Sequence, residues 1–315
     1  MSALLQVEHL KKYFNVPAGI NHAVDDVTFK IEKGETMGIV GESGCGKSTL
    51  GRTIIRLHDA SGGKVFLNGN DITKAKGKEL KRLRENMQII FQDPYSSLNP
   101  RMTVENAVQE PLRLSEKYNR GEIMEATQRL MDLCGVEERL RMSYPHEMDG
   151  GRRQRVGIAR ALALNPEFIM CDEPVSALDV SIQAQVLNLL MDLQEKLNLT
   201  YMFVTHDLSV VRHISNNICV MYLGQLVETG PSKELFEMPL HPYTKALLSA
   251  IPSVDLDNPM QRIMLKGEIT SPINPKPGCR FAARCRYAAE ICQQPQKLEE
   301  VASNHFVSCC RVKEI

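Results

Sequence analysis

The stretch with the clearest chemical meaning is residues 41–49, which read Gly-Glu-Ser-Gly-Cys-Gly-Lys-Ser-Thr and fit the pattern Gly-x4-Gly-Lys-Ser. Residues 36–40, just before it, are an apolar run that predicts a buried strand, and a helix is expected from Ser48 to about Leu57. Glycines at such a turn let backbone N–H groups point at an anion, where the helix dipole already favours negative charge. An accidental glycine-rich turn is the alternative, but the flanking strand and helix favour a phosphate-binding loop.

This loop predicts how a magnesium nucleoside triphosphate would be held. Lys47 would reach the β- and γ-phosphates, and the Ser48 hydroxyl would ligate Mg²⁺. The residues expected to contact the nucleotide are Gly41, Ser43, Gly44, Cys45, Gly46, Lys47, Ser48 and Thr49.

Two later apolar runs end in residues that could act on a phosphate. Residues 168–171 run into Asp172 and Glu173, and residues 201–204 run into Thr205-His206-Asp207. Such runs are typical of central parallel strands, which deliver polar side chains at their carboxyl ends. Asp172 would hold Mg²⁺ through its water shell, Glu173 would orient or deprotonate the attacking water, and His206 would contact the γ-phosphate.

The N-terminal part predicts further strands. Residues 4–10 and 24–31 alternate between apolar and polar side chains, and residues 63–67 precede Asn68-Gly69, a strong hairpin signal. Tyr13 lies between the first two strands. It could stack on a nucleotide base, although an isolated tyrosine at a strand connection is as often simple packing.

The middle of the chain changes character after the strand expected at residues 87–91. Helical spacing of apolar residues marks residues 104–114, 120–134 and 154–164. We therefore expect a mostly helical insertion over about residues 93–160, after which the parallel-sheet pattern resumes.

Composition limits the partners. The 315 residues carry 38 basic and 38 acidic side chains and are 43% hydrophobic, so the chain can fill a core and has no net charge. Zero net charge gives no reason to expect a nucleic acid. No signal peptide and no apolar stretch of about 18 residues is visible, so we expect a cytoplasmic chain whose membrane association is peripheral.

Five of the nine cysteines fall within the last 37 residues. In a cytosolic chain this favours a metal or iron–sulfur site over disulfides. Four thiolates fit either Zn²⁺ or an iron–sulfur cluster, unligated thiols are the third alternative, and the short Cys-x2-Cys knuckles usual for zinc are absent. Nine of the sixteen prolines lie between Pro231 and Pro295, which predicts a boundary near residue 231 and an irregular tail.

Six motifs, in order, resemble those of ABC-type ATPases. Residues 41–49, Gln92, 148–152, 168–173, 176–179 and His206 are similar to the Walker A, Q-loop, signature, Walker B, D-loop and H-loop. The resemblance covers residues 1 to about 235. The Asn-Lys-x-Asp motif of GTPases is absent from the sequence.

The resemblance implies an α/β fold: a P-loop ABC ATPase with a mixed sheet core, the helical insertion and an irregular Cys-rich C-terminal extension. The domains would be residues 1–235 and 236–315. It also implies that Ser48, Gln92 and Asp172 lie at Mg²⁺, with Gln92 and Lys47 joining Glu173 and His206 in catalysis. Asp149, Gly150, Gly151 and Asp179 are implied at the nucleotide, with Tyr13 on the base.

Within that superfamily the chain looks like the ATPase subunit of a dipeptide or oligopeptide importer, most like its F-type subunit. The segments that carry this resemblance are residues 91–94, 97–100, 174–181, 241–243 and 271–275. The family implies a second ATPase subunit, in a heterodimer, beneath two transmembrane permease subunits at the cytoplasmic face of the membrane. An extracytoplasmic peptide-binding protein feeds the complex, and no nucleic acid is expected.

The same resemblance bears on the cofactor and on the alternatives. It favours a [4Fe–4S] cluster held by Cys279, Cys285, Cys292 and Cys309, with Cys310 as the other candidate for the fourth ligand. The function alternatives are a soluble ABC ATPase of DNA repair, translation or iron–sulfur assembly, and an importer for nickel chelates, haem or sugars.

The signature departs from the family pattern Leu-Ser-Gly-Gly-Gln, because it reads Met148-Asp149-Gly150-Gly151-Arg152. The usual serine donates a hydrogen bond to a γ-phosphate, whereas an ionised Asp149 only accepts and carries like charge. Two unit charges ~4 Å apart repel by roughly 4 kcal/mol at an effective dielectric of 20, and Arg152 and Arg153 could offset part of this. We expect an asymmetric pair of nucleotide sites; the alternative is that Asp149 merely caps a helix.

Overall fold

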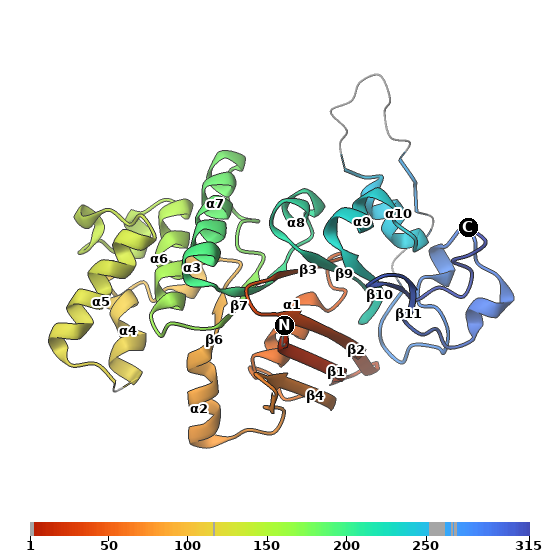
Figure 1. The fold of residues 1–315 in the computed structure, drawn as a ribbon, viewed down its shortest axis with the longest axis horizontal. Coiled ribbons are helices and arrows are strands. Elements are labelled where there is room, and N and C mark those ends of the chain that lie inside the picture. Colours follow the sequence, from red (N-terminus) through yellow and green to blue (C-terminus); the bar gives the residue numbers. More distant parts are fainter. Residues whose placement is uncertain (1–2, 116, 252–261, 266, 268–269) are drawn as a thin grey trace. The chain divides into compact units, whose positions relative to one another are not determined.

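The computed structural model describes residues 3–115, 117–251, 262–265, 267 and 270–315 (Figure 1). The chain divides into two compact units. Unit 1 consists of Met1–Lys74 with Phe203–Ile315, and unit 2 is Ala75–Met202. The C-terminal extension, defined here as residues 236–315, therefore belongs to the same unit as the N-terminal strands and the phosphate loop.

Unit 1 contains a four-stranded antiparallel sheet in the order β2-β1-β4-β5 (Figure 1). Leu5, Val7 and Leu10 of β1 are fully buried, as the alternation of apolar and polar residues along this strand predicts. The turn after β4 is Asn68-Gly69, and both residues have positive φ, 49° and 75°, as a two-residue hairpin turn prefers. The strands are β1 (Ala3–Val16), β2 (Gly19–Glu32), β4 (Gly62–Leu67) and β5 (Asn70–Asp71).

Unit 1 also contains a mixed sheet built on β3 (Thr36–Val40), whose five residues are all buried. β3 pairs in parallel with β9 (Asn217–Tyr222), which pairs antiparallel with β10 (Gln225–Pro231). β10 pairs with β12 (His305–Val307), and β12 with β11 (Glu299–Ala302), so the extension contributes strands to this sheet. The helices of unit 1 are α1 (Lys47–Ile54), α8 (Leu208–Ile214), α9 (Ser232–Glu237) and α10 (Pro242–Leu248), with 3₁₀ turns at Ala282–Arg284 and Glu290–Gln293.

Unit 2 joins two parallel strands to a group of helices. β6 (Met87–Ile90) pairs with β7 (Phe168–Asp172) in parallel register. Helices α4, α5 and α6 contact one another, and α6 also contacts α7 (Figure 1). The helices are α2 (Gly77–Asn86), α3 (Pro94–Ser97), α4 (Val104–Ser115), α5 (Arg120–Leu133), α6 (Gly150–Leu162) and α7 (Val180–Leu197), with 3₁₀ turns at Glu138–Leu140 and Pro145–Glu147. β8 (Thr200–Val204) contains the boundary between the units.

The α/β fold and the mixed sheet are confirmed, and the differences from the expected elements lie at their ends. The helix after the phosphate loop begins at Lys47 and stops at Ile54, three residues before Leu57, because Arg56 has a left-handed φ of 62°. α6 begins at Gly150, four residues before the apolar spacing at Gln154 indicated, because the two glycines have low helix propensity and hide the start. The tail expected to be irregular contains α10, the two 3₁₀ turns, β11 and β12 among its described residues.

No helix in the described ranges is both long enough and apolar enough to cross a membrane.

Candidate nucleotide-binding site

The conformation of the phosphate loop depends on glycine. Gly41, Gly44 and Gly46 have φ values of 152°, 76° and 106°, which L-residues with a side chain rarely adopt. A Cβ atom on Gly46 would lie 2.0 Å from the carbonyl oxygen of Ala23, and one on Gly41 would lie 2.1 Å from that of Met221. The loop therefore passes too close to neighbouring backbone for any other residue at these two positions.

Lys47 lies inside this loop. Its side chain is buried, with 4% relative exposure, and its ammonium donates hydrogen bonds to the carbonyl oxygens of Gly41 (2.8 Å) and Glu42 (3.0 Å). The charge is thus held against the backbone of the phosphate loop, the position from which a lysine contacts phosphates. Ser48 and Thr49 follow in the first turn of α1.

Cys45 is buried within the same loop, and its contact with the nucleotide stays a prediction. Its sulfur lies 4.0 Å from the Lys47 Nζ, and the side chain is buried. Burial raises the pKa of the Cys45 thiol, although the nearby Lys47 charge acts in the opposite direction. The group is therefore a neutral thiol at neutral pH.

Tyr13 lies within β1 and not, as expected, between the first two strands, because β1 continues to Val16. Its ring stacks on the His22 ring with centroids 4.0 Å apart and an interplanar angle of 25°, and its hydroxyl donates to Asp25. Burial raises the pKa of the Tyr13 hydroxyl, and the hydrogen bond to Asp25 adds to the rise. Arg280 of the extension also donates to Asp25. The proposed contact of Tyr13 with a base stays a prediction, but its ring is in a fixed orientation.

In unit 2, Gln92 and Glu173 are brought together at the carboxyl ends of β6 and β7. The Gln92 Nε2 donates a hydrogen bond of 3.1 Å to the Glu173 Oε2. Glu173 has a φ of 46°, which is uncommon for a residue with a side chain and marks a constrained turn. Its carbonyl oxygen accepts hydrogen bonds from the backbone N–H and the hydroxyl of Ser176. Asp172, the last residue of β7, is buried with 1% exposure.

Asp149 occupies the N-cap of α6. Its Oδ1 accepts from the backbone N–H of Arg152 (2.8 Å), and its Oδ2 accepts from the Arg152 guanidinium (3.1 Å). The same guanidinium donates to Glu137 (3.0 Å), so one arginine is shared between two carboxylates. The capping that we considered as an alternative role is present, and Arg152 provides part of the expected charge compensation.

The glycines after Asp149 have a packing role that the sequence did not indicate. A Cβ atom on Gly151 would lie 2.5 Å from the Ile182 side chain, and one on Gly150 would lie 2.9 Å from the Leu178 side chain. The start of α6 therefore approaches the segment that opens α7. Asp179 lies in this segment at the N-cap position, exposed, and its nucleotide contact stays a prediction.

His206 follows β8 in the unit that carries the phosphate loop. The neighbouring Thr205 donates its N–H to the carbonyl oxygen of Ile39 in β3, which fixes the backbone just before the histidine. The His206 side chain is exposed, and its proposed role at the γ-phosphate stays a prediction.

Contacts link three of the five cysteines of the extension. The N–H of Cys279 donates to the carbonyl oxygen of Cys292 (2.8 Å), and the sulfur atoms of Cys292 and Cys310 are 4.0 Å apart. Burial raises the pKa of the Cys279 thiol to about 11, and the charges of Cys292, Cys309 and Cys285 act in the same direction. None of the five forms a disulfide. Across the described residues, no group of three or more His, Cys, Asp or Glu side chains is arranged to hold a metal ion.

Sequence reasoning missed the residues that join the extension to the nucleotide site. Glu42 of the phosphate loop is bound by Arg284 and Tyr243, and Asp25 is bound by Arg280. The only available signal was that each of the two arginines stands next to a cysteine in the sequence. That signal does not identify a partner more than two hundred residues away.

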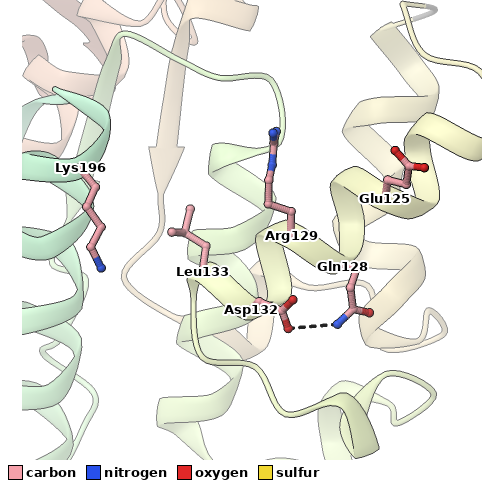
Figure 2. Close-up of a pocket in the computed structure, with 6 residues that line it drawn as sticks. All are labelled: Glu125, Gln128, Arg129, Asp132, Leu133 and Lys196. Atoms are coloured by element: carbon pink, nitrogen blue, oxygen red, sulfur yellow. Dashed lines mark hydrogen bonds between the residues drawn. The ribbon is translucent and has the colours of Figure 1, made fainter.

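A pocket of about 710 Å³ lies elsewhere, in unit 2, between α5 and α7 (Figure 2). Figure 2 shows Gln128 and Asp132 joined by a hydrogen bond on α5, with Lys196 coming from α7. None of the predicted site residues lines this pocket. Its lining residues are Glu125, Gln128, Arg129, Asp132, Leu133 and Lys196.

A phosphate loop closed around its own lysine, and an Asp-Glu pair at a strand end beside a glutamine, define a P-loop ATPase. Residues 24–176 match the ABC transporter family, and residues 227–292 match the C-terminal region of oligopeptide/dipeptide transporters.

Curated relatives extend the match to nearly the whole chain. The oligopeptide transport ATP-binding protein AppF of Bacillus subtilis is 50% identical over 317 residues, covering 97% of this chain and 96% of AppF. OppF of Salmonella typhimurium, also an oligopeptide transport ATP-binding protein, is 48% identical over 98% of this chain and 96% of OppF. The chain belongs to the ABC transporter ATPases and, within them, to the family of oligopeptide transport ATP-binding proteins.

Solved structures of ABC ATPases share the fold. CbiO1 of Clostridium perfringens, part of the ABC transporter complex CbiONQ, matches with a TM-score of 0.68 and 30% identity over 75% of this chain and 92% of CbiO1. The ATP-binding cassette MJ0796, solved as a dimer bound to ADP and phosphate, matches with a TM-score of 0.66 and 29% identity over 72% of this chain and 98% of MJ0796.

Proposed function

We propose that this chain is the ATP-hydrolysing subunit that powers import of di- or oligopeptides across the cytoplasmic membrane. The observation that carries the substrate class is the match of residues 227–292 to the C-terminal region of oligopeptide/dipeptide transporters, together with relatives named for oligopeptide transport. That region lies outside the general ATPase core, so it favours a peptide importer over soluble ABC ATPases and over importers of nickel chelates, haem or sugars.

The proposed mechanism assigns each polar group a step. Lys47, already buried within the loop, neutralises charge on the β- and γ-phosphates. Glu173 accepts a proton from the attacking water, and Gln92, which is hydrogen-bonded to it, orients that carboxylate. His206 contacts the γ-phosphate.

The donor set suits Mg²⁺, the hard cation of phosphoryl transfer, because Ser48, Gln92 and Asp172 offer only oxygen ligands. When held by these residues, Mg²⁺ would supply positive charge that offsets the negative charge developing on the phosphates. Asp172 is nearly inaccessible to bulk solvent, and we expect it to hold Mg²⁺ through the water shell of the ion. These residues bind the Mg²⁺ and orient the nucleotide, and the bond that hydrolysis breaks lies within the nucleotide.

We place the chain in a heterodimer with a second ABC ATPase. The dimeric ATP-binding cassette MJ0796 supports the pairing of two such subunits. Each nucleotide would lie between the phosphate loop of one subunit and the signature helix of the other, Asp149, Gly150 and Gly151 here, with Asp179 nearby. ATP then stabilises the closed pair and hydrolysis releases it. Two transmembrane permease subunits at the cytoplasmic face and an extracytoplasmic peptide-binding protein complete the proposed complex, without nucleic acid.

Reconstitution tests this assignment. The chain is co-expressed with the candidate partner ATPase and the two permease subunits, and the complex is placed in liposomes with the binding protein. We expect co-purification and an ATPase rate that rises when a peptide is added, but not when a nickel chelate, haem or a sugar is added. ATPase activity that ignores peptides, or a chain that never associates with permease subunits, would remove the peptide-importer assignment.

For the cysteines we propose a [4Fe–4S] cluster held by Cys279, Cys285, Cys292 and Cys309. The backbone hydrogen bond between Cys279 and Cys292 and the 4.0 Å between the sulfur atoms of Cys292 and Cys310 support a shared ligand. A cluster would supply a covalent cross-link to a segment with little regular structure. Zinc and unligated thiols are the alternatives.

Anaerobic purification with iron, sulfide and zinc analysis decides among them. We expect about four irons per chain and a brown protein, in line with the cluster type. Colourless protein with zinc and no iron would overturn the proposal. Cys310 lies near the Cys292 sulfur, so Cys309→Ser and Cys310→Ser are compared: the variant that loses iron identifies the fourth ligand.

A further inference from the structure

A carboxylate inside the phosphate loop is neutralised from the far end of the chain. The Arg284 guanidinium forms a two-pronged ion pair with Glu42, with distances of 2.7 Å from Nη1 to Oε2 and 3.1 Å from Nη2 to Oε1. The Arg284 side chain is 9% exposed and that of Glu42 is 23% exposed. This is the geometry in which an arginine pairs most strongly with a carboxylate.

The backbone of the same residue is held by a second group of the extension. The N–H of Glu42 donates to the hydroxyl of Tyr243 in α10 at 2.8 Å. Tyr243 is fully buried, and its ring packs against Tyr222 (4.7 Å between centroids) and Phe281 (5.4 Å). This buried aromatic cluster therefore fixes the direction in which the Glu42 N–H points at the start of the phosphate loop.

Another arginine of the extension fixes the surroundings of the loop. Arg280, 7% exposed, donates to the Asp25 carboxylate and to the carbonyl oxygen of Leu223. The next residue, Gly224, donates its N–H to the carbonyl oxygen of Cys45 at 2.8 Å. The extension thus reaches the phosphate loop along two routes.

Charge explains why the first route matters for ATP. Glu42 carries a negative charge in a loop that must accept a triphosphate, and like charges oppose binding. The Arg284 guanidinium donates both hydrogen bonds of the pair to Glu42 and is charged at any physiological pH, so it compensates the charge of that carboxylate. Removing Arg284 would leave the Glu42 charge uncompensated beside the phosphates, and would also free the loop to move.

We propose that Arg284 is a positioning residue of the ATP site, acting through Glu42, and that Tyr243 supports it by holding the Glu42 N–H. The proposal concerns ATP binding, and it holds whether or not the cysteines carry a cluster. It predicts weaker ATP binding with little change in the turnover of bound ATP. The reason is that the ion pair between Arg284 and Glu42 is present both when ATP binds and when it reacts, so it stabilises the two states equally.

Mg·ATP binding to the full-length chain and the steady-state kinetics of the assembled transporter test it. Arg284→Ala should raise the KM for ATP and the Kd about tenfold, with kcat within about twofold, since one charge near the phosphates is worth roughly that factor when partly screened. Arg284→Lys keeps the charge but loses the two-pronged pair, so about threefold weakening is expected. Arg286→Ala, an exposed arginine two positions along, is the matched control and should leave the KM unchanged.

The double variant distinguishes charge compensation from simple docking of the extension. Adding Glu42→Gln to Arg284→Ala should restore most of the lost ATP affinity, because the uncompensated charge is gone. A merely structural Arg284 would lower the melting temperature, leave the KM unchanged in Arg284→Ala, and gain nothing from Glu42→Gln. Either of these last two results overturns the proposal, and if Arg284→Ala does not fold, Arg284→Lys against Arg286→Lys makes the same comparison. Iron content is measured in each variant, so that an effect passing through the cysteines is recognised by lost iron.

Discussion

The Gln92 amide donates a hydrogen bond of 3.1 Å to the Glu173 carboxylate, which joins the residues that follow two adjacent parallel strands. This contact holds the carboxylate of the proposed base in one orientation. A substitution of Gln92 should therefore change the orientation of the Glu173 carboxylate. The φ of 46° at Glu173 adds a second constraint, so the carboxylate is placed by its backbone as well as by its partner.

We expect Glu173→Gln to bind ATP and to hydrolyse it at least about a hundredfold more slowly, because the amide has the same shape but cannot accept a proton. The closed pair with ATP trapped should accumulate. Single-turnover hydrolysis and retention of labelled ATP in the assembled transporter measure the two effects. Hydrolysis at the wild-type rate would mean that Glu173 is not the base, or that this nucleotide site is silent.

Lys47→Ala provides the contrasting case. Its ammonium is buried among loop carbonyls, and the charge that contacts the phosphates is lost, so ATP binding and hydrolysis should both fall. Equilibrium binding of Mg·ATP separates the two variants: Glu173→Gln retains affinity and Lys47→Ala loses it. Equal affinity in both variants would contradict the assignment of Lys47.

Two glycine substitutions separate conformation from close packing. Gly46→Ala should lower the free energy of unfolding by about 3 kcal/mol, because it combines a left-handed φ with a Cβ atom 2.0 Å from the Ala23 carbonyl oxygen. Gly69→Ala has a similar φ of 75° but no atom within 4 Å of the new Cβ, so about 1 kcal/mol is expected. Denaturant unfolding measures both, and equal losses would show that the close approach at Gly46 is relieved by movement.

Local signals predicted the parts of the site that are local in the chain. The phosphate loop needs only glycine freedom, one lysine and a helix start, all within residues 41–49, so its pattern is visible in the sequence. The pair of Glu42 with Arg284 joins positions 242 residues apart, and nothing near either residue indicates the other. The same holds for the shared use of Arg152 by Asp149 and Glu137, which depends on how the segment before α6 folds back.

Acid should destabilise the extension through His241. Burial lowers the pKa of His241 from 6.5 to about 4; Glu228 acts against this shift and Lys245 adds to it. The neutral ring accepts the N–H of Tyr243 at Nδ1 (3.1 Å) and so caps α10, a bond that protonation would remove. The unfolded state binds the proton first, so stability present above pH 6.5 is lost as pH falls toward 4, by up to about 3 kcal/mol.

Unfolding free energies measured from pH 7 to pH 4.5 check this window. His241→Asn keeps a capping acceptor but cannot titrate, so its stability should fall less over that range. The exposed His9 provides the control substitution, His9→Asn, which should keep the wild-type slope. A slope in His241→Asn as steep as in the wild type would show that other groups cause the acid sensitivity.

The signature motif supports a last prediction, that the two nucleotide sites of the complex are unequal. Asp149 caps α6 and pairs with Arg152, and this pair is about half exposed, so compensation is incomplete and salt-dependent. A carboxylate facing the γ-phosphate of the partner's nucleotide still opposes closure, and it cannot donate the hydrogen bond that serine makes. The site formed with Lys47 and Glu173 should therefore turn over ATP, while the site formed with Asp149 binds weakly or turns over slowly.

Asp149→Asn separates charge from capping, because asparagine caps a helix as well as aspartate but carries no charge. It should keep the melting temperature and raise occupancy of the site that contains Asp149 by about tenfold or more, given a repulsion of a few kcal/mol before screening. Asp149→Ser with Arg152→Gln should raise total ATPase only about twofold, since one site already works. A sharp rise would show instead that an engineered or drifted signature disables the whole complex. An ATP-bound assembly with equally closed, equally active sites would exclude the asymmetry, leaving Asp149 as a helix cap alone.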